Sequence, residues 1–84
     1  MGSRQYSLRF MTHIGRLIEQ TLREQGRTVT WFAKQLCCTR PNVYKLFQKE
    51  SLDTHLLWRI SMILHCDFFR AYSLDLQREH LKME

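Results

Sequence analysis

The side chains best suited to recognition chemistry lie between positions 40 and 45. Arg40, Asn42 and Lys45 carry hydrogen-bond donors, and Pro41 and Tyr44 stand among them. When a helix is presented to the DNA major groove, Arg or Lys can bond guanine O6 and N7, and Asn can bond adenine. The chemistry open to this segment is therefore the reading of base edges, provided that a helix exposes these side chains together.

The surrounding sequence predicts such a helix over residues 40–48. Thr39 can cap it, and Pro41 fits the first turn, where its missing N–H costs nothing. The helical period places two groups on opposite sides: Val43, Leu46 and Phe47 on one, and Pro41, Tyr44, Lys45 and Gln48 on the other. From the spacing alone, a solvated helix face explains the polar side as well as a binding surface does.

A second helix is predicted directly before it, over residues 29–36. Its apolar positions follow the helical spacing i, i+3, i+4 and i+7, at Val29, Phe32, Ala33 and Leu36. Thr28 or Thr30 can cap the first turn. Because only residues 37–39 separate the two helices, they must cross steeply, as in a helix-turn-helix.

Three further helices complete a predicted all-α fold. Residues 12–25 carry an apolar stripe that ends at Gly26, where a left-handed residue is expected. Asp53 can cap a helix ending near His65, and Asp67 can cap a fifth. No segment alternates as a strand would. The predicted core consists of Ile14, Leu17, Ile18, Leu22, Phe32, Ala33, Leu36, Val43, Leu46, Phe47, Leu57, Ile60 and Leu64.

The chain length favours a single domain. We expect it over residues 12–72, with an N-terminal arm over residues 1–11, part of which could remain from cloning, and a C-terminal tail over residues 73–84. No apolar run approaches the roughly 20 residues that span a bilayer, and no signal peptide is recognisable. Three cysteines, two of them adjacent, disfavour a disulfide framework. We therefore expect a cytoplasmic protein with reduced thiols and no membrane partner.

The basic charge is unevenly distributed. The formal net charge is +5, yet residues 1–52 carry nine basic and three acidic residues, whereas residues 53–84 carry four basic and five acidic ones. A basic half of this kind is typical of a surface that binds a polyanion.

The stretch from Thr28 to Phe47, TVTWFAKQLCCTRPNVYKLF, resembles the helix-turn-helix of the lambda-repressor-like family, also called the Cro-type or xenobiotic-response-element family. Ala33 falls where that family has its small residue at the helix crossing, and Val43 where it has the apolar residue of the recognition helix. Residues 51–68 resemble the family's fourth helix and its exit into a fifth. The resemblance covers about residues 12–72.

Three positions depart from the family's pattern. Cys37 stands where the family usually has Gly in a left-handed turn, which strains or reshapes that turn. Val29 stands where many members have a Gln that reaches a phosphate, so Thr28 or Thr30, with the backbone amides of the second helix, is left to make that contact. Phe47 replaces a frequent Glu and belongs to the apolar side of the helix.

The resemblance implies a five-helix lambda-repressor-like domain that binds double-stranded DNA sequence-specifically, with residues of about 40–48 in the major groove, and regulates transcription in a bacterial or phage setting. It assigns Arg40, Pro41 and Lys45 to positions that face bases, and Asn42 and Tyr44 to flanking positions nearer the backbone. Arg40 and Lys45 could instead bind phosphates unselectively. The candidate DNA-binding residues are Thr28, Thr30, Thr39, Arg40, Pro41, Asn42, Tyr44, Lys45 and Lys49.

A protein-interaction module of the same fold, such as an antitoxin or an assembly partner, is the alternative function. Trp31, Trp58 and Met62 lie off the apolar stripes, where they would suit either a partner surface or the edge of the core. Salt dependence separates the two functions, because contacts with several phosphates weaken steeply as salt rises, whereas an apolar protein interface does not.

Other kinds of site are less well supported. A zinc site is disfavoured because its only candidate ligands are two adjacent pairs, Cys37 with Cys38 and His65 with Cys66. The four histidines lie on separate segments without a nearby nucleophile or carboxylate pair. We therefore expect no enzyme, no cofactor and no metal, and no small-molecule site is evident.

Regulators of this type usually pair two copies on neighbouring half-sites, so a homodimer is expected. The expected surface lies near the end of the chain, where several large apolar residues are close together: Phe68, Phe69, Tyr72, Leu74 and Leu76. In the alternative, Phe68, Phe69 and Tyr72 close the core of a monomer and the tail frays.

Overall fold

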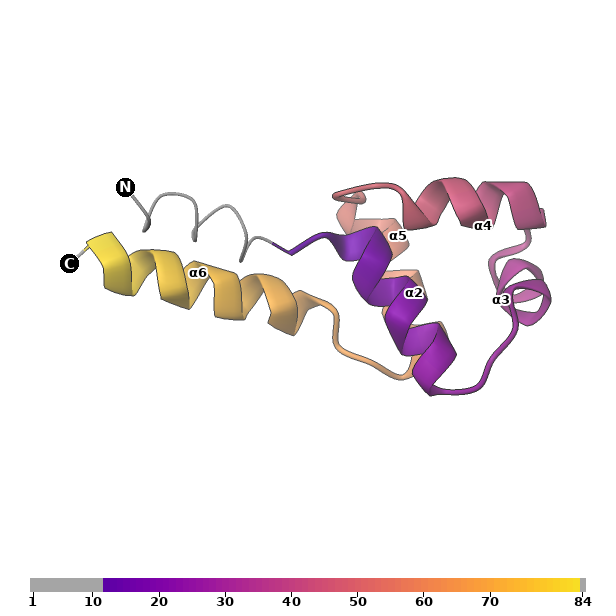
Figure 1. Cartoon of the computed structure of the whole chain (residues 1–84), viewed down its shortest axis with the longest axis horizontal. Helices are drawn as coiled ribbons and strands as arrows, with labels where there is room; N and C mark the ends of the chain where they lie inside the picture. The colour runs from indigo at the N-terminus through magenta and orange to yellow at the C-terminus, as the bar shows by residue number, and fades with distance from the viewer. Residues whose placement is uncertain (1–11, 84) are drawn as a thin grey trace.

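The structure is a computed structural model that describes residues 12–83, with side chains described over residues 12–79. In this part of the chain the helices are α2 (Ile14–Glu24), α3 (Val29–Leu36), α4 (Arg40–Phe47), α5 (Thr54–Leu64) and α6 (Phe69–Met83) (Figure 1). The described residues include no strand, which confirms the all-α prediction. The predicted N-terminal arm, residues 1–11, lies outside the described residues.

Most helix ends form as the sequence predicts. The side chains of Thr28, Thr39 and Asp53 accept a hydrogen bond from a backbone amide in the first turn of α3, α4 and α5 respectively. These bonds satisfy donors that have no partner within their own helix. Gly26 has a φ of +71°, which confirms the left-handed residue expected after α2. The N-cap of α2, His13, was not predicted from the sequence.

The core lies between α2, α3, α4, α5 and the start of α6. Every residue predicted to be buried is buried except Leu17, which is half-buried at the edge of the core. Phe68 joins the core with 1% of its surface exposed. The alternative in which Phe68 closes the core of the monomer is therefore correct for this residue.

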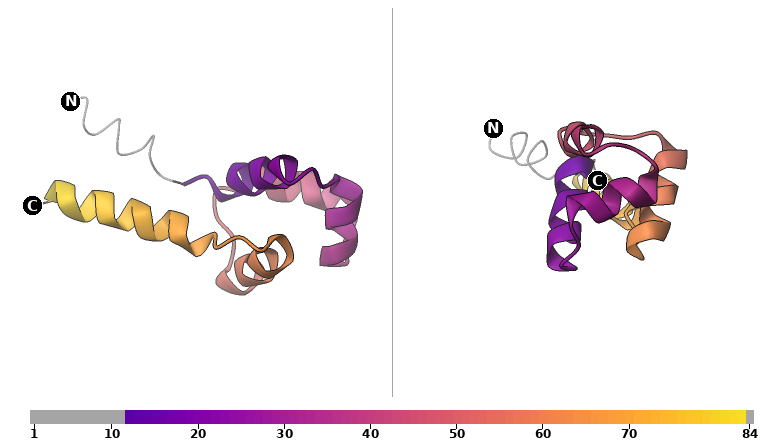
Figure 2. Two further views of the ribbon diagram at one scale, coloured as in Figure 1. Left: turned by 90° about the horizontal axis from the view of Figure 1, so that it is seen from below. Right: turned by 90° about the vertical axis from the view of Figure 1, so that its right-hand side faces the viewer.

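Helix α6 extends away from the body formed by α2 to α5, as Figures 1 and 2 show, and the molecule measures 44 × 23 × 21 Å. Its helical conformation continues to Met83, so the predicted domain boundary at residue 72 falls inside a helix. No helix within residues 12–83 is both long and apolar enough to cross a bilayer.

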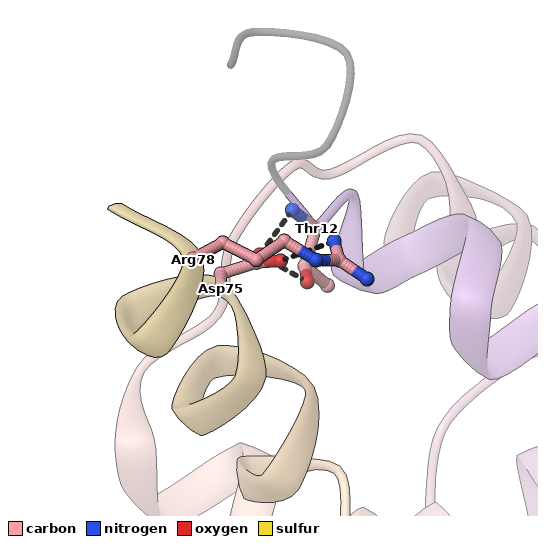
Figure 3. Close-up of polar contacts among 3 residues, drawn as sticks. All are labelled: Thr12, Asp75 and Arg78. Atoms are coloured by element: carbon pink, nitrogen blue, oxygen red, sulfur yellow. Dashed lines mark hydrogen bonds and ion pairs between the residues drawn. The ribbon is translucent and has the colours of Figure 1, made fainter. Parts of the chain in front are cut away.

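A carboxylate on α6 holds this helix beside the residue that leads into α2. Asp75 Oδ2 accepts hydrogen bonds from the backbone amide of Thr12 at 2.7 Å and from its hydroxyl at 2.5 Å. Arg78 Nη1 lies 3.5 Å from Asp75 Oδ1 (Figure 3). The partners are 63 positions apart in sequence, so this contact joins α6 to the opposite end of the described chain.

The start of α2 is hydrogen-bonded to the segment directly after α4. The amide of Ile14 donates to the Glu50 carbonyl at 3.1 Å, and the amide of Gly15 donates to the Lys49 carbonyl at 2.9 Å. These are first-turn amides, which lack partners within α2. A Cβ on Gly15 would lie only 2.6 Å from the Leu46 carbonyl oxygen, so the absence of a side chain permits this approach.

We expect Gly15→Ala to lower the free energy of unfolding by about 2 kcal/mol or more, because the added methyl group must displace the backbone at the end of α4. This loss should occur although alanine is the better helix former. Urea denaturation measures it, and Arg16→Ala at the exposed neighbouring position is the matched control, with an expected change below about 0.5 kcal/mol. A Gly15→Ala protein as stable as the parent would contradict this packing.

Candidate nucleic-acid interface

A tight turn joins α3 to α4. Cys37 adopts the left-handed conformation, with φ 58° and ψ 44°. Its amide donates to the Lys34 carbonyl, and the amide of Cys38 donates to the Ala33 carbonyl at 2.9 Å. These bonds satisfy the last carbonyls of α3 in the way glycine-ended helices do, although a residue with a Cβ pays roughly 1–2 kcal/mol for this conformation. The strained turn that the sequence predicted at Cys37 is therefore present.

One side of α4 is anchored in the core. Val43, Leu46 and Phe47 are buried, and the Phe47 ring stacks on Phe32 of α3 with centroids 6.5 Å apart and planes 7° apart. The opposite side of α4 is exposed, which matches the two sides predicted from the helical period. The contact between the two rings fixes the rotation of α4 about its own axis, and this rotation decides which side chains face solvent.

All nine candidate DNA-binding residues are exposed. Thr28 and Thr30 lie at the start of α3, and Thr39 and Lys49 lie just before and just after α4. The other five lie on α4 itself: Arg40, Pro41, Asn42, Tyr44 and Lys45. The structure thus places the candidates at the start of α3, along the exposed side of α4 and at the two ends of α4.

Among the residues whose side chains the structure describes, no carboxylate forms an ion pair with the cations of α3, α4 and the turn after α4. From Gln25 to Lys49 the sequence contains five basic residues and no acidic one. The ion pairs among the described residues are Arg23 with Glu19 and Arg78 with Asp75, so Arg40, Lys45 and Lys49 form none within that part of the chain. Unpaired cations that are close together attract a polyanion more strongly than cations paired within the protein.

The two threonine caps keep a donor for a ligand. Thr28 Oγ1 accepts from the Trp31 amide at 3.0 Å, and Thr39 Oγ1 accepts from the Asn42 amide at 3.4 Å. A hydroxyl that accepts a hydrogen bond still has its own proton to donate, for example to a phosphate oxygen. Thr30 is not the cap of α3; it lies exposed in the first turn of that helix.

Tyr44 combines anchoring with exposure. Its ring lies edge-on to the buried Phe47 ring, with centroids 6.3 Å apart and planes 80° apart, and half of its surface is exposed. A ring held in this way loses little side-chain entropy when it contacts a ligand, because it is already ordered.

One contributor to this surface and one buried residue that positions it were missed in the sequence. The Arg27 guanidinium lies 4.2 Å from the centroid of the Trp31 ring, which partly orders a cation directly before α3. The four-residue spacing of Arg27 and Trp31 was the available signal. Gly15 was the other, because a glycine inside a helical pattern usually has a packing reason.

The cysteines and histidines that a metal or catalytic site would need do not form such a site among the described residues. All three thiols are free, and within residues 12–79 no three metal-ligating side chains lie close enough together to hold an ion. His13 caps α2, and His65 ends α5 in the left-handed conformation. Burial, with a contribution from Asp67, raises the pKa of the Cys66 thiol, and burial followed by Asp75 raises the pKa of the Tyr72 hydroxyl.

Comparison with known proteins adds no relative, because no family model, curated protein or solved structure matches this chain. The surface formed by α3 and α4 is therefore the main indication of function.

The raised pKa of Cys66 predicts a stability change at alkaline pH. The unfolded chain loses the thiol proton near its ordinary pKa of 9.0 while the folded chain keeps it, so the free energy of unfolding falls as pH rises above that value. Cys66→Ser should make the fall between about pH 8 and about pH 10 shallower. Urea denaturation across this range, with Cys37→Ser at an exposed thiol as control, measures it. An unchanged slope in Cys66→Ser would contradict the assignment.

Proposed function

We propose that the chain is a helix-turn-helix protein of the lambda-repressor-like type that binds double-stranded DNA sequence-specifically and regulates transcription. The observation that carries the proposal is the exposed side of α4, where unpaired cations and hydrogen-bond donors lie on a helix whose other side is buried. A rigid helix that presents donors in this way suits the DNA major groove.

The side chains divide into two roles. Arg40 and Lys45 bond base edges, with Asn42 and Tyr44 beside them, and Pro41 offers only apolar contact, for example to a thymine methyl. Thr28, Thr30, Thr39 and Lys49 bind phosphates, which fixes the register of α4 without reading sequence. Both groups are exposed, and within residues 12–83 the three cations need not break an ion pair to bind.

Selection of DNA from a random library, followed by binding measurements on the selected and on random sequences, tests the proposal. Arg40→Ala should weaken binding to the selected sequence by about 1–3 kcal/mol and relax its base preference. Lys49→Ala should weaken both DNAs equally and reduce the slope of log affinity against log salt by about one.

Lys34→Ala is the matched control, because Lys34 is exposed on α3 but is not among the candidates. It should change neither base preference nor affinity by more than a small amount. Equal losses on selected and random DNA for Arg40→Ala would reject its base-reading role. A library without enrichment at low salt would reject DNA recognition and favour the interaction-module alternative.

Two copies acting together are part of the proposal. A projecting helix of 15 residues is marginally stable alone in water, so contact with a partner helix would stabilise α6. Leu76 has 70% of its surface exposed, and Phe69, seven positions earlier and therefore on the same side of the helix, is also exposed. Leu74 lies on the other side, where it lines a pocket between α6 and α2. We assign this surface to a second copy, which would place two α4 helices on half-sites about one DNA turn apart.

Leu76→Glu should shift the protein from dimer to monomer, because pairing would bury an unpaired charge. Gln77→Glu introduces the same charge at the adjacent exposed position and should leave the dimer intact. Sedimentation measures the difference. The protein concentration should be on the order of tens of micromolar, well above the dissociation constant of a stable dimer. A parent protein that sediments as a monomer would contradict stable pairing without DNA.

A specific feature of α5 supports the alternative function as a protein-interaction module. Trp58 and Met62 are 53% and 59% exposed and lie four residues apart, on one side of the helix. The His55 ring lies 6.0 Å from the Trp58 ring. Exposed aromatic and Met side chains are enriched in protein interfaces. Binding of a protein partner that survives high salt would favour this function.

A further inference from the structure

A pocket beside α4 has a chemical character that the DNA-binding proposal does not require. Its volume is about 280 Å³, and leucines from α3, α4, the following loop and α5 contribute to its wall: Leu36, Leu46, Leu52 and Leu56. Leu36 and Leu46 belong to the buried core, and the other two are half-buried. An apolar chain placed here would be removed from water on several sides.

The polar part of the pocket is cationic. Lys45 and Lys49 line it, and no acidic residue does. Lys45 lies on α4 and Lys49 lies just after its end, and both line the same pocket. Neither forms an ion pair within residues 12–83, and Asn42 adds an amide donor to the lining. An anionic group at this end would meet cations without a competing carboxylate.

We propose that this pocket binds a small amphipathic organic anion, specifically a medium-chain aliphatic carboxylate. The alkyl chain packs on the four leucines, and the carboxylate receives charge-assisted hydrogen bonds from Lys45 and Lys49. The volume lies near the lower end of the range of small-molecule pockets, roughly 300–1,000 Å³, which favours a compact ligand. The leucines come from separate segments, which is why the sequence alone shows no such site.

Because the pocket shares two lysines with the proposed DNA-binding surface, a bound ligand would change the affinity for DNA. This consequence rests on the proposed DNA-binding function. Lys45 and Lys49 cannot bind a carboxylate and DNA fully at the same time, so the ligand weakens DNA binding. By thermodynamic linkage, DNA must weaken ligand binding by the same factor. The pocket would therefore make DNA binding responsive to an amphipathic carboxylate.

Three probe molecules separate the contribution of the negative charge to binding from that of the alkyl chain. In titrations of the full chain followed by NMR, octanoate should bind and shift the amides around the pocket. Acetate has the charge without the chain, and 1-octanol has the chain without the charge. Each should bind at least about tenfold more weakly than octanoate. Equal binding of octanol and octanoate would overturn the proposal and favour an apolar partner segment as the occupant.

Variants test the two lysines. The double substitution Lys45→Gln and Lys49→Gln should weaken octanoate binding about tenfold or more and leave octanol binding unchanged. Lys34→Gln, at an exposed lysine that does not line the pocket, is the matched control. Unchanged octanoate affinity in the double variant would overturn the assignment. Since all three lysines are exposed, each variant should have nearly the same melting temperature as the parent protein.

The adjacent cysteines supply an internal reporter. Cys38 lines the pocket and is half-buried, whereas Cys37 is exposed and is not part of the lining. Saturating octanoate should slow the alkylation of Cys38 by iodoacetamide and leave that of Cys37 unchanged, as measured by mass spectrometry. Equal protection of both thiols, or of neither, would contradict binding in this pocket.

A competition experiment tests the regulatory consequence separately. Octanoate should displace the protein from its selected DNA, and acetate at the same ionic strength should not. Octanoate that occupies the pocket without lowering DNA affinity would overturn the competition. If the protein binds octanoate but no DNA, the ligand site stands and the proposed function fails; if it binds DNA but not octanoate, the ligand site fails and the proposed function stands.

Discussion

The hydrogen bonds between the start of α2 and the segment directly after α4 are the constraint on which the exposed surface depends. The amides of Ile14 and Gly15 would otherwise lack partners, and they bond to carbonyls directly after α4. Gly15 permits this approach because a Cβ would collide with the backbone of α4. Together with the stacking of Phe47 on Phe32, this junction holds α4 at both its end and its buried side.

The short helix α4 performs two tasks with different residues. Val43, Leu46 and Phe47 are buried, so the position of the helix does not depend on its polar side. The fold therefore does not depend on its exposed cations, and these cations form no ion pair with the described carboxylates. Lys45 and Lys49 face both the proposed DNA surface and the leucine-lined pocket, so one pair of charges could serve two anionic ligands.

Helix α6 differs from the rest of the molecule in how it is held. Phe68 fills the core directly before it, and the Asp75 carboxylate bonds to Thr12. Beyond these contacts the helix leaves the body and exposes Leu76. The apolar residues near the end of the chain therefore divide between the core of the monomer and a surface available to a second copy. Sequence spacing could not make this division, because both environments favour the same residue types.

The sequence by itself determined the helices, the N-caps of α3, α4 and α5 and almost the whole core, because helical periodicity and capping are local properties. It also placed the exposed side of α4 correctly, since the burial of Val43, Leu46 and Phe47 follows from their spacing. Only the tertiary structure decided the contact of Gly15 with α4, the bond between Thr12 and Asp75, and the pocket beside Lys45 and Lys49. Each of these joins segments that are distant in sequence, and their meeting depends on how the helices pack.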